Sequence, residues 1–165
     1  MVKTPVSSFD VKIKTQTQIK KMISNYRKNG KKVAFTNGCF DILHYGHVKY
    51  LKDAKQMADM LVVGLNSDTS VRRIKGKLRP INTERDRARV LAALSCVDYI
   101  TIFSEETPLR LIKLIKPDVL IKGGDWDMAK IVGSGFVKTY GGKTVVIPYL
   151  KGYSTTSLIE KIHCG

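Results

Sequence analysis

Residues 33–47 read VAFTNGCFDILHYGH. The first five residues, VAFTN, are mostly apolar and β-forming, and they predict a short strand. Gly38 then predicts a tight turn, and a loop leads into a helix that we expect over about residues 46–58. This order of strand, loop and helix is typical of the first half of a βαβ unit.

The sequence on either side of this stretch continues the alternation. Apolar residues at helical spacing predict a helix over residues 17–28. Four more apolar runs predict strands at residues 60–66, 98–103, 119–122 and 143–148. Further helices are expected at about residues 83–94, 107–116 and 154–162. We therefore predict an α/β fold: a single Rossmann-like domain whose five-stranded, mostly parallel sheet carries helices on both faces.

The length of 165 residues fits one domain, which we expect over residues 17–165 after an N-terminal arm at residues 1–16. No apolar run is long enough to span a membrane. The first residues lack the apolar core of a signal peptide, which favours a cytoplasmic location. The three cysteines, Cys39, Cys96 and Cys164, match no disulfide framework, so we expect reduced thiols.

The chain is strongly basic, with a formal net charge of +15. Residues 1–32 hold nine Lys or Arg against one acid, and residues 72–79 (RRIKGKLR) hold five basic residues and no acid. A solvated lysine-rich surface explains the first excess, whereas attraction of small anionic substrates suits the compact 72–79 cluster better. Nucleic-acid binding is a third explanation, but neither a recognition helix nor an aromatic platform accompanies the charge.

Two of the three histidines lie together in the loop after the first expected strand. His44 and His47 flank Gly46 at the start of the expected helix, and a spacing of three residues puts both imidazoles on one side of a helix. The free N–H groups of a helix N-terminus add positive potential. The pattern indicates a polyphosphate site, although two surface or capping histidines would look the same.

The segment TNGCFDILHYGH at residues 36–47 resembles the HxGH signature of the HIGH-type nucleotidyltransferase superfamily. Over residues 17–162 the chain resembles the adenylyltransferase part of ADP-heptose synthase, which occurs fused to a sugar kinase or as a stand-alone heptose 1-phosphate adenylyltransferase. The other matching segments are NSD at 66–68, KG at 75–76, RP at 79–80, VD at 97–98, KGGD at 122–125 and STT at 154–156.

The resemblance implies that AMP passes from ATP, accompanied by Mg²⁺, to D-glycero-D-manno-heptose 1-phosphate, giving ADP-heptose for lipopolysaccharide biosynthesis. It implies these catalytic residues: His44, His47, Lys75 and Lys77. The expected nucleotide-binding residues are Thr36, Asn37, Gly38, Phe40, His44, Gly46, His47, Gly124, Asp125, Ser154, Thr155 and Thr156. The expected substrate-binding residues are Asp41, Asn66, Asp68, Lys75, Arg79 and Arg87.

This chemistry needs no nucleophile from the protein. The second pKa of a sugar phosphate is about 6, so the acceptor is largely a dianion at neutral pH and attacks the α-phosphate itself, in line and without a covalent intermediate. Catalysis then consists of positioning and charge neutralisation. We therefore expect Cys39 to be neither a nucleophile nor, with His44 and His47, a zinc ligand, because no Cys-x-x-Cys motif supports such a site.

Structural explanations stay open for several of these residues. Lys75 and Lys77 are also compatible with a solvated loop, and Ser154–Thr156 with a simple helix cap. Residues 123–125 fit an ordinary turn, Arg87 fits an ion pair with Glu84 on its own helix, and Trp126 fits packing better than base stacking.

Three other functions remain open from the sequence. The Lys-Gly-Lys at residues 75–77 also suits a cytidylyltransferase for glycerol 3-phosphate or another small phosphate. A non-catalytic basic module would bind nucleic acid in a salt-sensitive way, and a nucleotide sensor would bind without turnover. The preferred interpretation has nucleotide and heptose phosphate as ligands, no nucleic acid or membrane as partner, and a homo-oligomer, dimer or larger, as its assembly.

Overall fold

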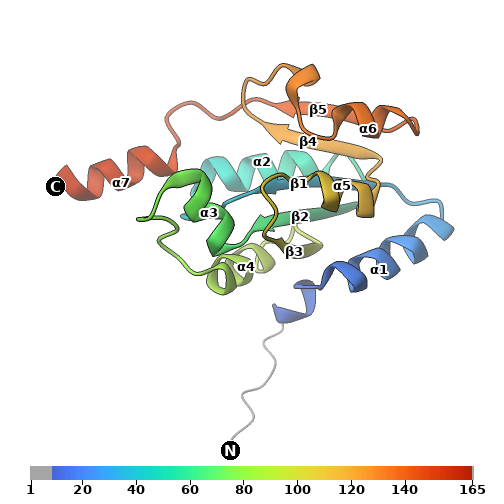
Figure 1. The fold of residues 1–165 in the computed structure, drawn as a ribbon, viewed down its shortest axis with the longest axis horizontal. Coiled ribbons are helices and arrows are strands. Elements are labelled where there is room, and N and C mark those ends of the chain that lie inside the picture. Colours follow the sequence, from blue (N-terminus) through green and yellow to red (C-terminus); the bar gives the residue numbers. More distant parts are fainter. Residues whose placement is uncertain (1–8, 165) are drawn as a thin grey trace, which may run out of the picture.

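The computed structural model describes residues 9–164, which form a five-stranded sheet with helices on both faces (Figure 1). The strands are β1 (Val33–Gly38), β2 (Met60–Asn66), β3 (Tyr99–Phe103), β4 (Val119–Gly123) and β5 (Lys143–Ile147). Their order is β3-β2-β1-β4-β5, and every pair is parallel. The predicted fold class is confirmed, and the sheet of the described residues is entirely parallel.

The helices follow the alternation expected from the sequence. They are α1 (Gln16–Lys28), α2 (Tyr45–Lys55), α3 (Asp68–Lys75), α4 (Glu84–Ala92), α5 (Leu109–Ile115), α6 (Ser134–Lys138) and α7 (Thr155–Cys164). Short 3-10 turns occur at Asp10–Lys12 and Met128–Lys130. The side chains of Thr15, Ser67 and Thr83 cap α1, α3 and α4 by accepting hydrogen bonds from first-turn N–H groups.

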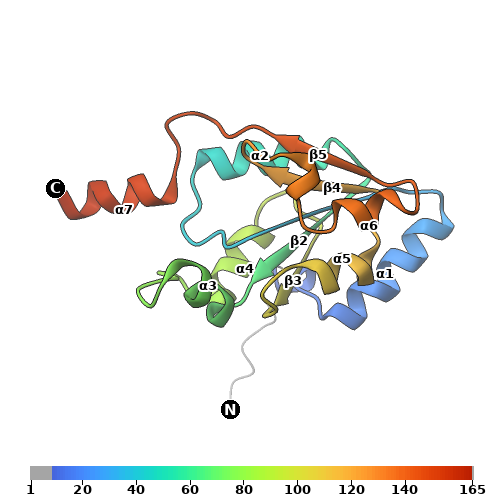
Figure 2. The same ribbon diagram turned by 45° about the horizontal axis from the view of Figure 1, so that its top comes forward.

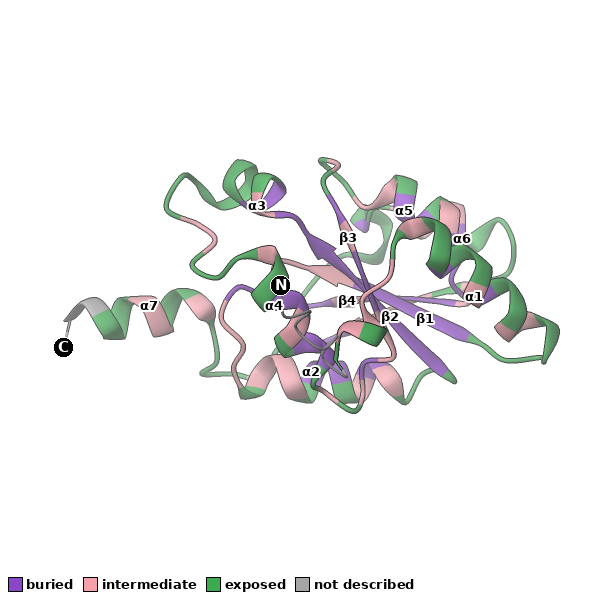
Figure 3. Cartoon of the chain, turned by 90° about the horizontal axis from the view of Figure 1, so that it is seen from below, coloured by how far each residue is buried: buried purple, intermediate pink, exposed green. Residues whose placement is uncertain are grey.

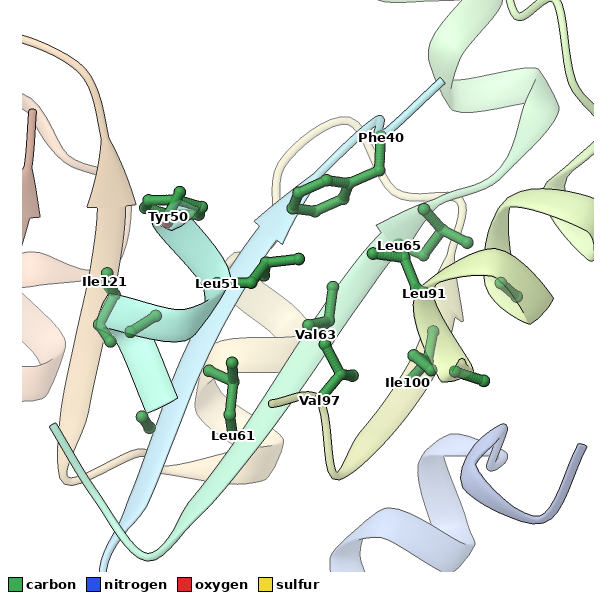
Figure 4. Close-up of a cluster of buried hydrophobic side chains, with 14 of the residues drawn as sticks. Phe40, Tyr50, Leu51, Leu61, Val63, Leu65, Leu91, Val97, Ile100 and Ile121 are labelled. Atoms are coloured by element: carbon green, nitrogen blue, oxygen red, sulfur yellow. The ribbon is translucent and has the colours of Figure 1, made fainter. Parts of the chain in front are cut away.

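The sheet separates two apolar cores, because side chains alternate between its faces. On one face, Leu51 of α2 and Leu91 of α4 pack with Val63 and Ile100 of the sheet (Figure 4). On the other face, Ile19 of α1 and Ile112 of α5 belong to the second cluster. Strand β2 is fully buried and β1 largely so, whereas the edge strand β5 is only partly buried, and the helices expose their outer sides (Figure 3).

Helix α3 was not predicted, because the basic segment at residues 72–79 dominates that part of the sequence. Ser67 Oγ accepts a hydrogen bond from the N–H of Ser70, which starts the helix, and Val71 is buried. The helix ends at Gly76, whose φ of 95° a non-glycine residue would adopt only with strain. Helix α6 was also missed, since five residues are too few for a periodic pattern.

Part of the expected N-terminal arm packs against the domain. Asp10 forms an ion pair with Arg89 of α4 (3.0 Å), and Lys12 Nζ donates to the carbonyl of Leu94 (2.9 Å). Ile13 forms a parallel bridge to Ile100 at the outer edge of β3. Residues 1–8 lie outside the described residues, so the boundary at residue 16 stays a prediction.

The strand order creates a switch point between β1 and β4. The chain winds outward from β1 to β2 and β3 on one side, and through β4 to β5 on the other (Figure 2). In such sheets ligands bind beyond the carboxyl ends of the two central strands. The loops after β1 and β4 are therefore the places where function is expected, and α7 extends away from the sheet (Figures 1 and 2).

Leu91 and Val90 offer a matched test of the first core, because they are neighbours on α4 with opposite exposure. Leu91 is fully buried and Val90 is 51% exposed. We expect Leu91→Ala to lower the free energy of unfolding by about 2–5 kcal/mol, because it leaves a cavity. Val90→Ala should change it by about 0.5 kcal/mol or less. Urea denaturation measures both, and equal losses would contradict the assigned packing.

Candidate active site

The loop that follows β1 is held by a buried aromatic ring. Phe40 has a φ of 43°, in the left-handed region that costs energy for a non-glycine residue, and its side chain is buried in the core (Figure 4). The ring lies against Gly38, where an added Cβ would meet Phe40 Cε2 at 2.9 Å. Its centroid is 5.4 Å from that of His47, in edge contact. The glycine and the phenylalanine thus fix where the loop presents its histidines.

His44 and His47 stack on each other. Their ring centroids are 3.8 Å apart with an interplanar angle of 22°, and the Nδ1 atom of each is buried without a hydrogen-bond partner among the described residues. Burial and the neighbouring His44 lower the pKa of His47 to about 4, and burial also lowers the pKa of His44. Both imidazoles are therefore neutral at pH 7, and no internal hydrogen bond at Nδ1 opposes their binding to a ligand.

Helix α2 begins directly at this histidine pair. His44 is its N-cap residue but makes no side-chain capping bond, in contrast to Thr15, Ser67 and Thr83, and the first turn contains no acid. The N-terminal N–H groups of α2 and its dipole therefore favour an anion at this place. Gly46 is required here, because an added Cβ would lie 2.9 Å from Cβ of Tyr153 and 3.1 Å from the ring of His44.

The segment before α7 borders the same place. The ring of Tyr153 lies 6.1 Å from that of His44 and 5.6 Å from that of Tyr45, and Thr155 Oγ1 donates to the carbonyl of Ile42 (3.4 Å). Ser154 Oγ accepts a hydrogen bond from the N–H of Ser157 (3.1 Å), so a capping role for Ser154 is present. Phosphate binding by Ser154, Thr155 and Thr156 stays a prediction.

Asp41 joins the loop after β1 to residues 79–82. Its carboxylate, almost fully buried, accepts from Arg79 Nε (2.5 Å) and from the N–H groups of Ile81 (2.8 Å) and Asn82 (3.0 Å). Burial raises the pKa of Asp41, but the hydrogen bonds from Asn82, Ile81 and Arg79 outweigh it and leave the pKa below its ordinary value. Asp41 and Arg79, both expected to contact substrate, bind each other here.

Arg87 forms a second set of internal hydrogen bonds. Its guanidinium is fully buried and donates to Asp68 Oδ1 (2.7 Å), to the carbonyl of Asn82 (3.0 Å) and to the carbonyl of Cys39 (2.5 Å). The pairing of Arg87 with Glu84 was wrong, because Arg87 points inward, and Glu84 instead accepts from the N–H of Asp68 (2.7 Å). In this structure Arg87 holds the loop after β1 in place through the carbonyl of Cys39. Direct substrate binding by Arg87 or Asp68 stays a prediction.

Two further predicted residues are buried and use their polar groups internally. Thr36 Oγ1 lies 2.6 Å from the hydroxyl of Tyr50, and Asn66 Nδ2 donates to Ser70 Oγ (2.9 Å). Asn37, next to Thr36 in β1, faces the opposite side of the sheet and lines a separate pocket there. The structure therefore does not bring all predicted ligand-binding residues onto one surface.

The remaining predicted site residues are two lysines near the end of α3 and the Gly-Asp pair after β4. Lys75 ends α3 and Lys77 follows it, both exposed, and Lys75 is an electrostatic neighbour of Cys39. Burial raises the pKa of the Cys39 thiol despite Lys75 and Arg87, so the thiol is protonated at neutral pH. Gly124 has a φ of 111° and lies under the ring of Tyr149, and Asp125 beside it is exposed.

No group of three His, Cys, Asp or Glu side chains within the described residues is arranged to hold a metal ion. Cys39 and Cys96 carry free thiols. Within the same part of the chain, no helix has the length and apolar character needed to cross a bilayer.

The cytidylyltransferase-like family matches residues 35–161, which include the histidine loop and the segment before α7. The chain belongs to this family. Two relatives, each named bifunctional protein HldE, support the assignment: those of Syntrophotalea carbinolica and Geobacter metallireducens are 50% and 53% identical over 154 and 156 residues. The match covers 93% and 94% of this chain but 31% and 32% of theirs, so the chain spans about a third of these relatives.

Two solved structures share the family's fold. The lipopolysaccharide core biosynthesis protein from Thermoplasma volcanium is 31% identical with a TM-score of 0.61, and the match covers 76% of this chain and 100% of that one. Pantoate-beta-alanine ligase from Francisella tularensis, solved with beta-gamma ATP and beta-alanine, also has a TM-score of 0.61, and the match covers 93% of this chain and 78% of that one. At 18% identity this second likeness shows the fold alone.

Sequence reasoning missed three side chains around the site. Tyr149 and Tyr153 were passed over because aromatic residues in a loop have no periodic pattern. Lys122 left a clearer trace: it interrupts the apolar run VLIK of β4, where a charged residue needs a reason.

The histidine pair gives a pH-dependent expectation. Because the ordinary pKa of histidine is 6.5 and that of His47 is about 4 in the fold, the unfolded chain takes up this proton first as the pH falls. The free energy of unfolding should therefore decrease as the pH is lowered from 6.5 to 4. ¹⁵N NMR titration of the free protein should show His47 titrating near pH 4, and titration near 6.5 would contradict its burial.

Asp41→Asn tests the tie between the two loops. The variant keeps the shape but loses the charge, so we expect faster hydrogen exchange at the amides of Ile81 and Asn82 and a loss of about 1–3 kcal/mol in unfolding free energy. In the wild type the same contribution is present above pH 3.8 and is lost as the pH falls through the lowered pKa of Asp41.

The matched control is Asp53→Asn, which removes only the exposed ion pair to Lys49 and should change stability by about 0.5 kcal/mol or less. Unchanged exchange at Ile81 and Asn82 in Asp41→Asn would mean that the carboxylate does not hold this loop.

Proposed function

We propose that the chain is a nucleotidyltransferase that transfers AMP from ATP to D-glycero-D-manno-heptose 1-phosphate and releases pyrophosphate. The observation that carries the proposal is the pair of stacked, neutral imidazoles at the uncapped start of α2, beside the switch point of the sheet. Membership of the cytidylyltransferase-like family supports nucleotidyl transfer as the reaction. The resemblance of the motifs to the adenylyltransferase part of ADP-heptose synthase supports ATP and a heptose phosphate as substrates.

The reaction needs little proton chemistry from the protein. A phosphate oxygen of the acceptor forms a bond to the α-phosphorus of ATP, and the bond from that phosphorus to the bridging α–β oxygen breaks. The electron pair leaves on pyrophosphate, opposite the attacking oxygen. Since both reactants are anions, the main barrier is electrostatic, and fixed donors and cations lower it without reorganisation.

The residues divide this task between them. His44 and His47 donate N–H groups to the triphosphate, together with the N-terminal amides of α2. Because the imidazoles are neutral, they contribute oriented hydrogen bonds and no net charge. The exposed ammonium groups of Lys75 and Lys77 contribute positive charge at the transferred phosphate. Asp41 and Arg87 act indirectly, by holding residues 79–82 and the Cys39 carbonyl in place.

Mg²⁺ in this proposal arrives with ATP as part of the substrate. The carboxylates of Asp41 and Asp68 are each paired with an arginine, so the phosphate oxygens and water are the better ligands for the ion. ATP is a cytoplasmic metabolite, and a cytoplasmic location is therefore part of the proposal. So is a homo-oligomeric state, with neither nucleic acid nor membrane as partner.

A second candidate is a cytidylyltransferase for glycerol 3-phosphate or another small phosphate, which Lys75 and Lys77 on either side of Gly76 also suit. Pyrophosphate release from ATP, CTP and GTP, each with heptose 1-phosphate or glycerol 3-phosphate, separates the two. We expect ATP with heptose 1-phosphate to be turned over fastest. A preference for CTP would support the second candidate, and no release with any pair, together with salt-sensitive DNA or RNA binding, would contradict both.

The double variant His44→Ala/His47→Ala tests whether the stacked imidazoles contribute to the transfer. Losing both donors should lower kcat by about 10²–10⁴-fold, because each contributes mainly to the transition state. Cys39→Val is the control and should retain activity, since the protonated thiol has no part in the reaction. Wild-type turnover in the double variant would refute the role of the imidazoles.

A further inference from the structure

Helix α7 extends beyond the edge of the domain instead of packing along the sheet (Figures 1 and 2). The segment before it turns at Gly152, whose φ is 84°, and Thr155 Oγ1 donates to the carbonyl of Ile42 where the helix starts. The helix then continues for ten residues, and Ile162 near its far end is 73% exposed. A large apolar side chain is therefore left in contact with water at the end of an outlying helix.

The apolar side chains of α7 share one side of the helix. Leu158, Ile159 and Ile162 follow Thr155 by three, four and seven residues, which is the spacing of a single helical face. This face starts at the domain, where Leu158 is half-buried, and becomes exposed towards Ile162 (Figure 3). The helix therefore carries an amphipathic pattern whose outer half has no cover from its own domain.

A helix of this length gains little stability by itself. Isolated helices shorter than about 12–15 residues are marginal in water, and helices in proteins are stabilised mainly by packing of an apolar face. Helix α7 has ten residues, and Thr155, Thr156, Ile159 and Ile162 are β-branched, which lowers helix propensity further. We therefore expect a second surface to cover the outer half of this face.

Charge favours a second copy of this chain as the partner. The net charge is +15, and Lys and Arg outnumber Asp and Glu in each of the other α-helices of the described residues. In α7, by contrast, Glu160 balances Lys161. Two copies that met through another helix would bring positive charges together, whereas two α7 helices can approach without net repulsion.

A twofold axis also brings together two apolar groups that a single copy keeps apart. Tyr45 and Tyr153 lie beside the first turn of α7, are 58% and 45% exposed, and have ring centroids 5.6 Å apart. Ile162 is about 10 Å further along the helix axis than Thr155, because each residue adds 1.5 Å. In an antiparallel pair the last turn of each helix lies beside the first turn of the other, and the same contact forms twice.

We infer that two copies of this chain pair through α7, antiparallel and about a twofold axis, with Ile162 of each copy against Tyr45 and Tyr153 of the other. The inference rests on the homo-oligomeric state in the proposed function and deepens it by naming the surface. Tyr153 lies 6.1 Å from His44, ring to ring. The pairing therefore also holds the segment before α7 against the histidine pair.

Sedimentation velocity of the full chain tests the pairing. Two short helices and the rings at their first turns bury less than the roughly 1,200–2,000 Å² of a stable interface, so we expect a dimer with a dissociation constant of about 1–100 μM. Ile162→Glu puts an unpaired charge into the contact and should raise this constant at least about tenfold. Val90→Glu, at a site that is 51% exposed on α4, is the matched control and should leave it unchanged.

NMR of the wild type locates the interface without a substitution. On dilution the amide signals of Tyr45, Tyr153 and Ile162 should shift together, with the midpoint found by sedimentation, while those of α1 and α6 stay constant. Shifts confined to another surface would overturn the inference. A chain that is monomeric at every concentration would also overturn it, and contacts of the Ile162 methyl groups with their own domain would then make α7 a cover for its own site.

Assembly and turnover are measured separately, so the two proposals can fail separately. If the wild type dimerises through α7 but releases no pyrophosphate with any acceptor, the proposed transfer fails and this inference stands. If the wild type is active and its assembly is unaffected by Ile162→Glu, the α7 interface alone fails. Where both proposals hold, dilution below the dissociation constant should lower the specific activity of the wild type to that of Ile162→Glu.

Discussion

The buried carboxylate of Asp41 connects parts of the chain that are about forty residues apart. It accepts hydrogen bonds from Arg79, Ile81 and Asn82, and so fixes the segment after α3 to the loop after β1. The guanidinium of Arg87 continues the same network to Asp68 and to the carbonyl of Cys39. Because buried charges are tolerated only when they are paired and hydrogen-bonded, this network has few alternative arrangements. The hydrogen bonds of Asp41 and Arg87 together hold in place the loops that carry the histidines and the lysines.

The neutral hydrogen-bond donors and the cations of the site differ in how far they are buried. The imidazoles are stacked and partly buried, so protonating either would bring charge into a poorly solvated place beside the other. The cations Lys75 and Lys77 stay exposed, where their charge costs little and attracts anions over a longer range. A site with this division can bind a polyphosphate in a defined direction and still neutralise a second anion that approaches it.

The sequence predicted the strands, the sheet and the histidine loop because these depend on local patterns: apolar runs for β1 to β5 and a spacing of three for His44 and His47. It did not predict α3, whose start depends on a single cap at Ser67. The partners of Asp41 and Arg87 were also beyond reach, since a charged residue in a sequence does not reveal a counter-charge or a carbonyl contributed by a distant segment. Lys122 was readable as an anomaly in a buried strand, but its pocket forms only when β1, β4 and the loop after β4 meet.

The most direct test of the central claim is a crystal structure of the protein with a non-hydrolysable ATP analogue and Mg²⁺. We expect the β- and γ-phosphates within hydrogen-bond distance of His44, His47 and the first amides of α2, with the α-phosphate above Gly38 and Cys39. A triphosphate bound away from the start of α2, with the two imidazoles still stacked and free of contact to it, would contradict the claim.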